Sequence, residues 1–210
     1  MTNDQRETVC AVVVTYNRKN LLIECLEALR KQTRPVQGIY LIDNASTDRT
    51  PNFLLEKGYI KELPPENLKE HWEKEFKIKN LTDGNSIKLY YVRMHENTGG
   101  AGGFHEGVKR TYEKGYDWLW LMDDDVEPEK KALEILLRFK LISCFIHPRR
   151  KDINSNIYPW EGYIDLMTGL RVNMDDFSFK NNKSYSCVNI ACFEGALINK
   201  KIIEKNRFSR

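Results

Sequence analysis

Short apolar runs alternate with helical patterns along most of the chain, and this alternation predicts the fold class. Residues 9–14 and 38–43 are continuous β-rich runs, as expected for strands covered on both faces. Between them, apolar side chains recur at helical spacing over residues 21–29. A strand, a helix and a second strand in this order imply a crossover between parallel strands.

The same rhythm returns later in the chain. A third strand is predicted over residues 87–92, and the glycine-rich turn at 97–103 leads into a helix. A fourth, aromatic-rich run over 116–122 reaches three consecutive acids, Asp123 to Asp125. A helix over about 128–140 follows it.

Weaker signals complete the pattern. Residues 141–146 and 188–193 are further strand candidates. Residues 61–86, which contain adjacent prolines and many charges, suggest a surface insertion or an exposed helix with turns. We therefore predict one α/β domain over 1–210, with a mainly parallel sheet flanked by helices.

Composition narrows the function classes. A chain of 210 residues with 41% hydrophobic content can bury one core, and a net charge of +3 gives no argument for nucleic acid. The five cysteines form no CxxC pair, so neither a zinc site nor a disulfide framework is indicated. The N-terminus lacks a hydrophobic signal segment. We expect a soluble protein of a reducing, cytoplasmic compartment; peripheral association with a membrane is compatible with this.

The candidate chemistry follows the predicted strands. In open parallel sheets, ligands bind at the carboxyl ends of the strands, near the point where the strand order reverses. The polar residues that follow the four predicted strands are Thr15, Asn17, Arg18, Asp43, Asn44, Asn97, Asp123, Asp124 and Asp125, with glycines at 99, 100, 102 and 103. Groups of this kind suit a nucleotide.

The three acids are the most informative feature. In an extended chain, Asp123 and Asp125 point one way and Asp124 the other. Two carboxylates on one side suit a hard cation that keeps positions open for phosphate oxygens. The alternative is a solvated acidic turn before the next helix.

The other strand ends also allow two interpretations. Asp43 accepts hydrogen bonds either from a base or ribose, or from its own following turn. Thr15 and Arg18 contact a base or diphosphate, or else serve as a helix cap and a surface cation. The glycines permit close approach to a ligand, but a tight turn and close helix packing would explain two of the four.

Four segments, in order, resemble the second family of glycosyltransferases, whose nucleotide-sugar domain has the GT-A fold. They are VVVTYNR (12–18), LIDNASTD (41–48), ENTGGAGGF (96–104) and WLMDDDVEP (120–128), within the first two-thirds of the chain. The form NTGGAGGF is most similar to members that transfer galactofuranose or rhamnose.

The resemblance implies inverting transfer of a sugar from a UDP- or dTDP-type donor to the hydroxyl of a glycan or lipid-linked acceptor, in cell-surface polysaccharide synthesis. It assigns the nucleoside to Thr15, Asn17, Arg18, Asp43 and Asn44, and the donor pocket to Asn97, Gly99 and Gly100. It also implies that Asp123 and Asp125 bind Mn²⁺ or Mg²⁺, with Asp124 facing the donor ribose or sugar.

The catalytic base is where the sequence departs from the family. In the family, the catalytic base is a carboxylate from an acidic motif that would lie beyond Arg210. The acids present here, Asp175, Asp176 and Glu194, match that motif poorly. A nucleotide-sugar-binding domain without turnover is therefore an alternative. A sugar nucleotidyltransferase is another, but it would want a glycine-rich loop after the first strand, and residues 15–18 contain no glycine.

Overall fold

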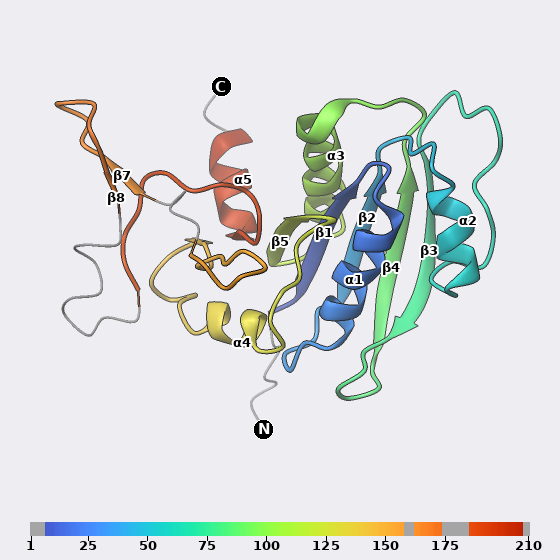
Figure 1. The fold of residues 1–210 in the computed structure, drawn as a ribbon, viewed down its shortest axis with the longest axis horizontal. Coiled ribbons are helices and arrows are strands. Elements are labelled where there is room, and N and C mark those ends of the chain that lie inside the picture. The colour runs from blue at the N-terminus through green and yellow to red at the C-terminus, as the bar shows by residue number, and fades with distance from the viewer. Residues whose placement is uncertain (1–6, 158–161, 174–184, 208–210) are drawn as a thin grey trace. The chain divides into compact units, whose positions relative to one another are not determined.

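The computed structural model describes residues 7–157, 162–173 and 185–207 (Figure 1). The chain divides into two compact units, one from Met1–Ile146 with Glu194–Arg210, the other His147–Phe193, where the sequence suggested one domain. The elements in chain order are β1 Val9–Thr15, α1 Lys19–Arg30, β2 Gly38–Asp43, α2 Thr50–Glu56, β3 Trp72–Lys79, β4 Ser86–Arg93, α3 Gly99–Glu113, β5 Trp118–Asp123, α4 Ala132–Leu137, β6 Phe145–Ile146, β7 Gly162–Ile164, β8 Arg171–Asn173, β9 Leu197–Asn199 and α5 Lys200–Arg207.

A seven-stranded sheet organises the first unit, in the order β3-β4-β2-β1-β5-β9-β6. Neighbours among β4, β2, β1 and β5 are parallel, whereas β3 runs antiparallel to β4 and β9 antiparallel to β5. Every residue of β1 is buried, as its uninterrupted apolar run predicted. The predicted α/β class is confirmed.

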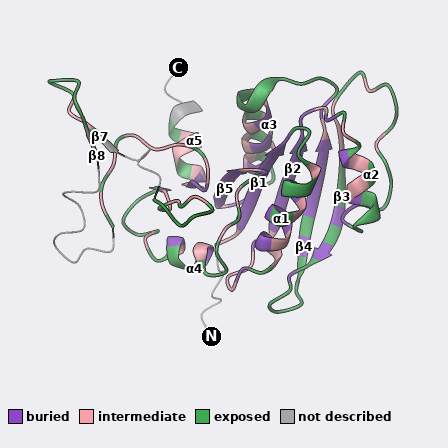
Figure 2. Ribbon diagram, viewed as in Figure 1, coloured by how far each residue is buried: buried purple, intermediate pink, exposed green. Residues whose placement is uncertain are grey.

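Helices cover both faces of this sheet. Side chains of α1, α2 and α4, including Leu22, Leu54 and Leu133, pack with one set of strand residues. Phe104 and Val108 of α3 and Ile203 of α5 pack on the opposite face. The buried strands between these helix layers are visible in Figure 2.

Two glycines let α3 approach the sheet closely. A Cβ atom at Gly103 would lie 2.6 Å from Val14 Cγ1, and one at Gly107 would lie 2.3 Å from Val12 Cγ1. Real Cβ atoms do not come this close to another carbon, so α3 or the facing valine would have to shift if either glycine were replaced. This close packing holds the N-terminus of α3 next to the end of β1.

The region 61–86 differs from its prediction as a surface insertion. Residues Trp72–Lys79 form the edge strand β3, which pairs along its whole length with β4. Phe76 and Ile78 alternate with exposed charged residues and are buried in the core. This is the period of a half-buried strand, which the high charge content concealed.

Later elements are shorter than predicted or lie elsewhere. The helix expected over 128–140 spans only Ala132–Leu137, and before it Gln32 Nε2 donates to the carbonyls of Pro128 and Glu129. The strand expected over 141–146 reduces to Phe145–Ile146. Residues 188–193 form no strand; Leu197–Asn199 pairs with β5 instead.

The second unit contains an antiparallel hairpin of β7 and β8. Its turn is closed by Asp165, whose Oδ1 accepts from the Met167 N–H at 2.8 Å. Asn189 hydrogen-bonds to both backbone groups of Ile164. Across the described parts of both units, no helix is long and apolar enough to cross a membrane.

Candidate functional site

Four parallel strands end at one edge of the sheet. Their last residues are Thr15, Asp43, Arg93 and Asp123. In the register, Thr15 pairs with Asp43, Asp43 with Arg93, and Val14 with Asp123. The chain builds outward from β1 first toward β2 and β4, then toward β5, so the strand order reverses at β1. This is where open α/β sheets bind their ligands.

The acidic segment leaves the strand at Asp123, and Asp124 and Asp125 lie in a turn. Arg18 Nη1 lies 2.6 Å from Asp125 Oδ2 and 3.6 Å from Asp124 Oδ1. The alternation expected for an extended chain therefore does not continue, since Asp124 and Asp125 share one guanidinium. Asp124 is also fixed by Thr15, whose Oγ1 donates to Asp124 Oδ2 at 2.6 Å.

The environment of Asp123 and Asp124 disfavours the negative charge of these two carboxyl groups. Burial raises the pKa of Asp123, and the neighbouring Asp125 and Asp124 raise it further against the opposing effect of Arg18. Burial also raises the pKa of Asp124, although the Thr15 hydroxyl and Arg18 partly offset this. A cation at this edge would therefore be favourable.

The donor atoms fit a hard divalent cation. Carboxylate oxygens suit Mg²⁺ and Mn²⁺, which are commonly bound by one or two carboxylates while phosphate and water complete the shell. Among the described residues, no group of three or more histidine, cysteine or acidic side chains is arranged to hold a metal. A cation at Asp123 and Asp125 would thus depend on ligands from outside the protein.

Asn17 joins the loops after β1 and β2. It has a positive φ of 58°, and its Oδ1 accepts from the backbone N–H groups of Thr47 at 2.6 Å and Asp48 at 3.2 Å. Asn17 does not cap α1, because Arg18 occupies the N-cap position and makes no side-chain capping bond. Asn17 instead shapes the β2–α2 loop.

Asp43 is fully buried and has three internal donors. Its Oδ1 accepts from the Ser46 N–H at 2.8 Å, which is the turn-capping role considered from the sequence. Its Oδ2 accepts from the Tyr91 hydroxyl and from Arg93 Nη1, both at 2.7 Å. A nucleotide contact for Asp43 stays a prediction that requires these partners to shift.

Tyr91 and Arg93 were missed in the sequence. Both come from β4, and burial, reinforced by Asp43, raises the pKa of Tyr91 well above its ordinary value. Arg93 also donates to the Ser46 carbonyl at 2.7 Å. The only signal available was positional: an arginine ends one predicted strand and an aspartate ends another.

Asn44 connects β2 to the start of α3. Its Nδ2 donates to Asn97 Oδ1 and to the Gly99 carbonyl, both at 2.9 Å. Its Oδ1 accepts from the Thr98 N–H at 3.0 Å and from the Thr98 hydroxyl at 3.3 Å. The hydrogen-bonding capacity of this amide is filled, which gives Asn44 a structural role. Its predicted contact with a nucleoside stays untested.

The glycines divide into two groups. Gly103 packs on β1, and a Cβ at Gly102 would lie 2.2 Å from Thr98 Oγ1. A Cβ at Gly99 or Gly100 would meet nothing within 4 Å, and Gly99 has a φ of +72°. Thr98, the N-cap residue, makes no side-chain capping bond. The Gly99 N–H donates to Asn97 Oδ1 at 2.8 Å, which leaves the following amides of the first turn to donate to an anionic oxygen.

Glu194 returns to the same edge of the sheet. The Gly195 N–H donates to the Leu121 carbonyl, and the Leu121 N–H donates to the Ala196 carbonyl, both at 2.8 Å. Gly195 and Ala196 thus both lie opposite Leu121. This arrangement is a β-bulge, a feature that is over-represented beside active sites. Glu194 precedes this bulge at the level where β5 ends. Asp175 and Asp176 lie outside the described residues.

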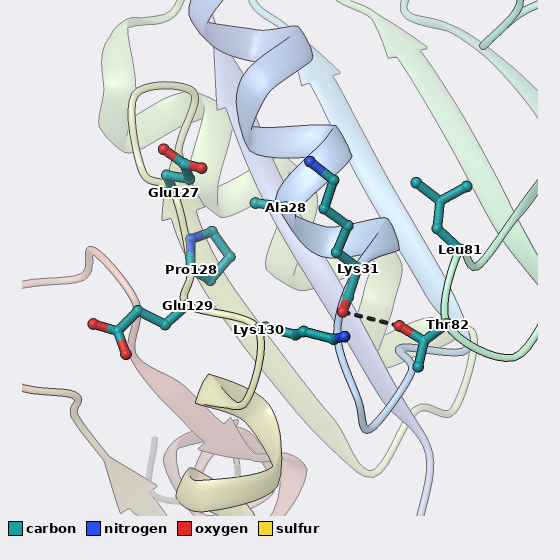
Figure 3. Close-up of a pocket in the computed structure, with 8 residues that line it drawn as sticks. All are labelled: Ala28, Lys31, Leu81, Thr82, Glu127, Pro128, Glu129 and Lys130. Atoms are coloured by element: carbon teal, nitrogen blue, oxygen red, sulfur yellow. Dashed lines mark hydrogen bonds between the residues drawn. The ribbon is translucent and has the colours of Figure 1, made fainter.

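A separate cavity of about 580 Å³ lies beside the C-terminal part of α1 (Figure 3). Its walls come from α1, the turn between β3 and β4, and the segment after the acids. The lining residues are Ala28, Lys31, Leu81, Thr82, Glu127, Pro128, Glu129 and Lys130. It shares no residue with the strand-end site, so we do not assign the predicted ligand to it.

The sheet and its strand-end site define an α/β fold of the GT-A class. The chain matches the sequence profile "Glycosyl transferase family 2" over residues 10–64 and 73–207 and belongs to this family. The family and the GT-A fold that the four sequence segments predicted are thereby confirmed.

Curated relatives include galactofuranosyltransferases. The chain is 32% identical over 122 residues to galactofuranosyltransferase GlfT1 of Mycolicibacterium smegmatis. It is 31% identical over 119 residues to GlfT1 of Mycobacterium tuberculosis H37Rv. These matches cover 58% and 57% of this chain, but 31% of each relative. The similarity thus spans less than a third of the relatives' length.

Solved structures support the fold. The chain is similar to S. aureus TarS 1–349 in complex with UDP, with a TM-score of 0.59 and 16% identity over 95% of this chain and 49% of that chain. The complex of TarS 1–349 with UDP-GlcNAc gives the same TM-score, with 47% of that chain covered. At this identity the likeness establishes the architecture.

Proposed function

We propose that this chain binds a nucleoside diphosphate sugar of the UDP or dTDP type, together with Mn²⁺ or Mg²⁺, and transfers the sugar with inversion to an acceptor hydroxyl. The observation that carries this proposal is the convergence of the β5 acids, Thr15 and Arg18 at one strand edge, close to the glycine-rich start of α3. Family membership and the galactofuranosyltransferase relatives support it.

Each part of the site has a distinct task in this proposal. Asp123 and Asp125 would hold the cation, which when bound would neutralise charge developing on the leaving diphosphate. Thr15 holds Asp124 by its hydrogen bond and so fixes the turn. Arg18 would exchange Asp125 for a diphosphate oxygen, because a guanidinium suits phosphate geometry.

The remaining donor contacts would come from backbone. The exposed amide at Gly100 would face donor oxygens, while Asn44 and Asn97 keep this turn in place, Asn97 by accepting from the Gly99 N–H. Asn17 would order the β2–α2 loop beside the nucleoside, through its bonds to Thr47 and Asp48. Among the described residues, Glu194 is the acid that we propose as the base.

The setting of the reaction is also proposed. A glycan or lipid-linked acceptor in cell-surface polysaccharide synthesis fits the galactofuranosyltransferase relatives. We place the reaction in the cytoplasm, at the cytoplasmic face of a membrane.

A panel of nucleoside diphosphates tests the donor class. Melting temperatures are measured with UDP, dTDP, GDP and ADP, each with and without Mn²⁺. We expect UDP or dTDP to raise the melting temperature only with metal. A ligand at 100 times its Kd adds about 2.7 kcal/mol to the free energy of unfolding, which is enough to shift the melting temperature measurably. No metal-dependent shift with any of the four would overturn the proposal.

Turnover is tested with nucleotide-sugars that carry the nucleoside diphosphate found to bind. Release of nucleoside diphosphate together with glycosylated acceptor supports transfer. Binding without release would instead support a nucleotide-sugar-binding domain, and pyrophosphate-dependent exchange would support a nucleotidyltransferase.

A further inference from the structure

Two histidines face each other at the end of the β3–β4 pair, outside the proposed donor site. His71 directly precedes β3, and His95 lies two residues beyond the end of β4. The pairing of Trp72 with Arg93 brings them together. Their Nδ1 atoms are 3.1 Å apart, and their rings are tilted by 38° with centroids 4.8 Å apart.

The ring geometry departs from a straight hydrogen bond. A linear N–H···N bond of this length would put the centroids about 5.3 Å apart, because each nitrogen lies ~1.1 Å from its ring centre. The observed 4.8 Å shows that the rings are bent relative to the line between the nitrogens. Two imidazoles on one tetrahedral ion have nitrogens about 3.3 Å apart, with rings bent in this way.

The opposite nitrogen of His95 has an acidic neighbour. Its Nε2 lies 3.5 Å from Glu96 Oε1. A carboxylate there favours the tautomer with the proton on Nε2 and leaves the Nδ1 lone pair for a ligand. Metal-binding histidines commonly have a carboxylate partner of this kind.

Burial favours the neutral form of His71, which is the form that binds metals. Burial lowers the pKa of His71; Glu106 and Glu96 oppose this, whereas His95 and Arg110 add to it. Arg110 is itself paired with Glu73 and Glu106, so its charge is balanced. A neutral imidazole needs no proton loss before it binds a cation.

We propose that His71 and His95 bind a divalent cation of the late first-row metals, such as Zn²⁺. The ligands are their Nδ1 atoms, and water completes the coordination shell. Imidazole ligands suit Zn²⁺, Ni²⁺ and Cu²⁺ rather than the hard cations expected at the acids. The bound ion would clip the start of edge strand β3 to the loop that leads to Asn97.

Calorimetric titration with Zn²⁺ tests the site. The titrated protein is the full chain carrying Cys144→Ser and Cys187→Ser, because these two exposed thiols would compete for the metal. We expect one Zn²⁺ per chain and a loss of affinity of tenfold or more in His71→Ala and in His95→Ala. The matched control is His105→Ala, which removes a histidine side chain that is 74% exposed.

Two further comparisons make the result decisive. Asp125→Ala should bind Zn²⁺ with unchanged affinity, so a failure of the donor-site proposal is distinguishable from a failure of this one. The variants His71→Gln and His95→Gln, with melting temperatures measured without metal, separate ligand loss from unfolding. The absence of saturable binding, or full affinity in folded variants of both histidines, would overturn the proposal.

Discussion

Arg18 is the residue that balances the acidic turn in the unliganded protein. Its guanidinium contacts both Asp124 and Asp125, while its side chain remains 53% exposed. An exposed ion pair of this kind contributes little to stability, so it can be broken at low cost. Arg18 is therefore suited to exchanging its partner when a cation and a diphosphate arrive.

Glycines with different surroundings make the clearest prediction at this scale. Gly107→Ala should lower the free energy of unfolding by about 1–3 kcal/mol, because its Cβ would overlap Val12. Gly100→Ala should leave the free energy of unfolding the same or higher, since a Cβ there meets nothing within 4 Å. Urea unfolding of both variants measures this difference.

The same pair of variants also separates packing from binding. Gly100→Ala should lower the affinity for the nucleoside diphosphate, because the added methyl group would occupy the side from which the donor approaches. Equal loss of stability in Gly100→Ala and Gly107→Ala would contradict this account of the glycine-rich turn.

At the scale of elements, the kind of apolar pattern decided what could be predicted. The uninterrupted runs of β1 and β2 identify buried parallel strands from local sequence alone. The alternation in β3 was hidden by its lysines and glutamates. Residues 188–193 and β9 are both apolar, and which of them pairs with β5 depends on register, which a local pattern does not contain.

Asp117 ties three elements together and makes an element-scale prediction. Its Oδ2 accepts from the Thr8 N–H and hydroxyl, and its Oδ1 from Lys200 Nζ, all at 2.9 Å. Burial alone would raise the pKa of Asp117, but the bonds from Lys200 and Thr8 outweigh it and lower the pKa. We expect Asp117→Asn to cost about 1–2 kcal/mol of unfolding free energy at neutral pH.

The lowered pKa fixes the pH dependence of this effect. A carboxyl with a depressed folded-state pKa contributes stability above its unfolded pKa and loses it as pH falls through the folded pKa. The difference between wild type and Asp117→Asn should therefore shrink toward acid pH in denaturant titrations. A difference that stays constant from neutral to acid pH would show that the charge is not its source. Lys200→Met, which removes only the ion pair, is the matched control.

At the scale of the whole molecule, strand order explains why much of the site was predictable. Residues that end parallel strands must meet at one edge, so the positions of Thr15, Asp43 and Asp123 follow from the strand pattern. Their partners do not follow in the same way. Arg93 reaches Asp43 only because β4 lies next to β2, a long-range pairing that local sequence does not specify.

The acidic turn shows the same limit. Three adjacent carboxylates repel one another, and the structure supplies the opposing charge of Arg18 from a different loop. What the sequence could not give was the end of the strand at Asp123, after which side chains no longer alternate. The assignment of Asp125 to the cation therefore depends on the shape of this turn when donor is bound.

Calorimetry of UDP and dTDP binding to wild type and Asp125→Ala, with and without Mn²⁺, tests the central claim most directly. The claim predicts that the affinity of Asp125→Ala in Mn²⁺ falls to that of the wild type without Mn²⁺, while its melting temperature is not reduced. Glu129→Ala, which removes an exposed acid four residues further on, should keep the Mn²⁺ effect. Undiminished Mn²⁺-dependent affinity in Asp125→Ala would contradict a cation held by these acids.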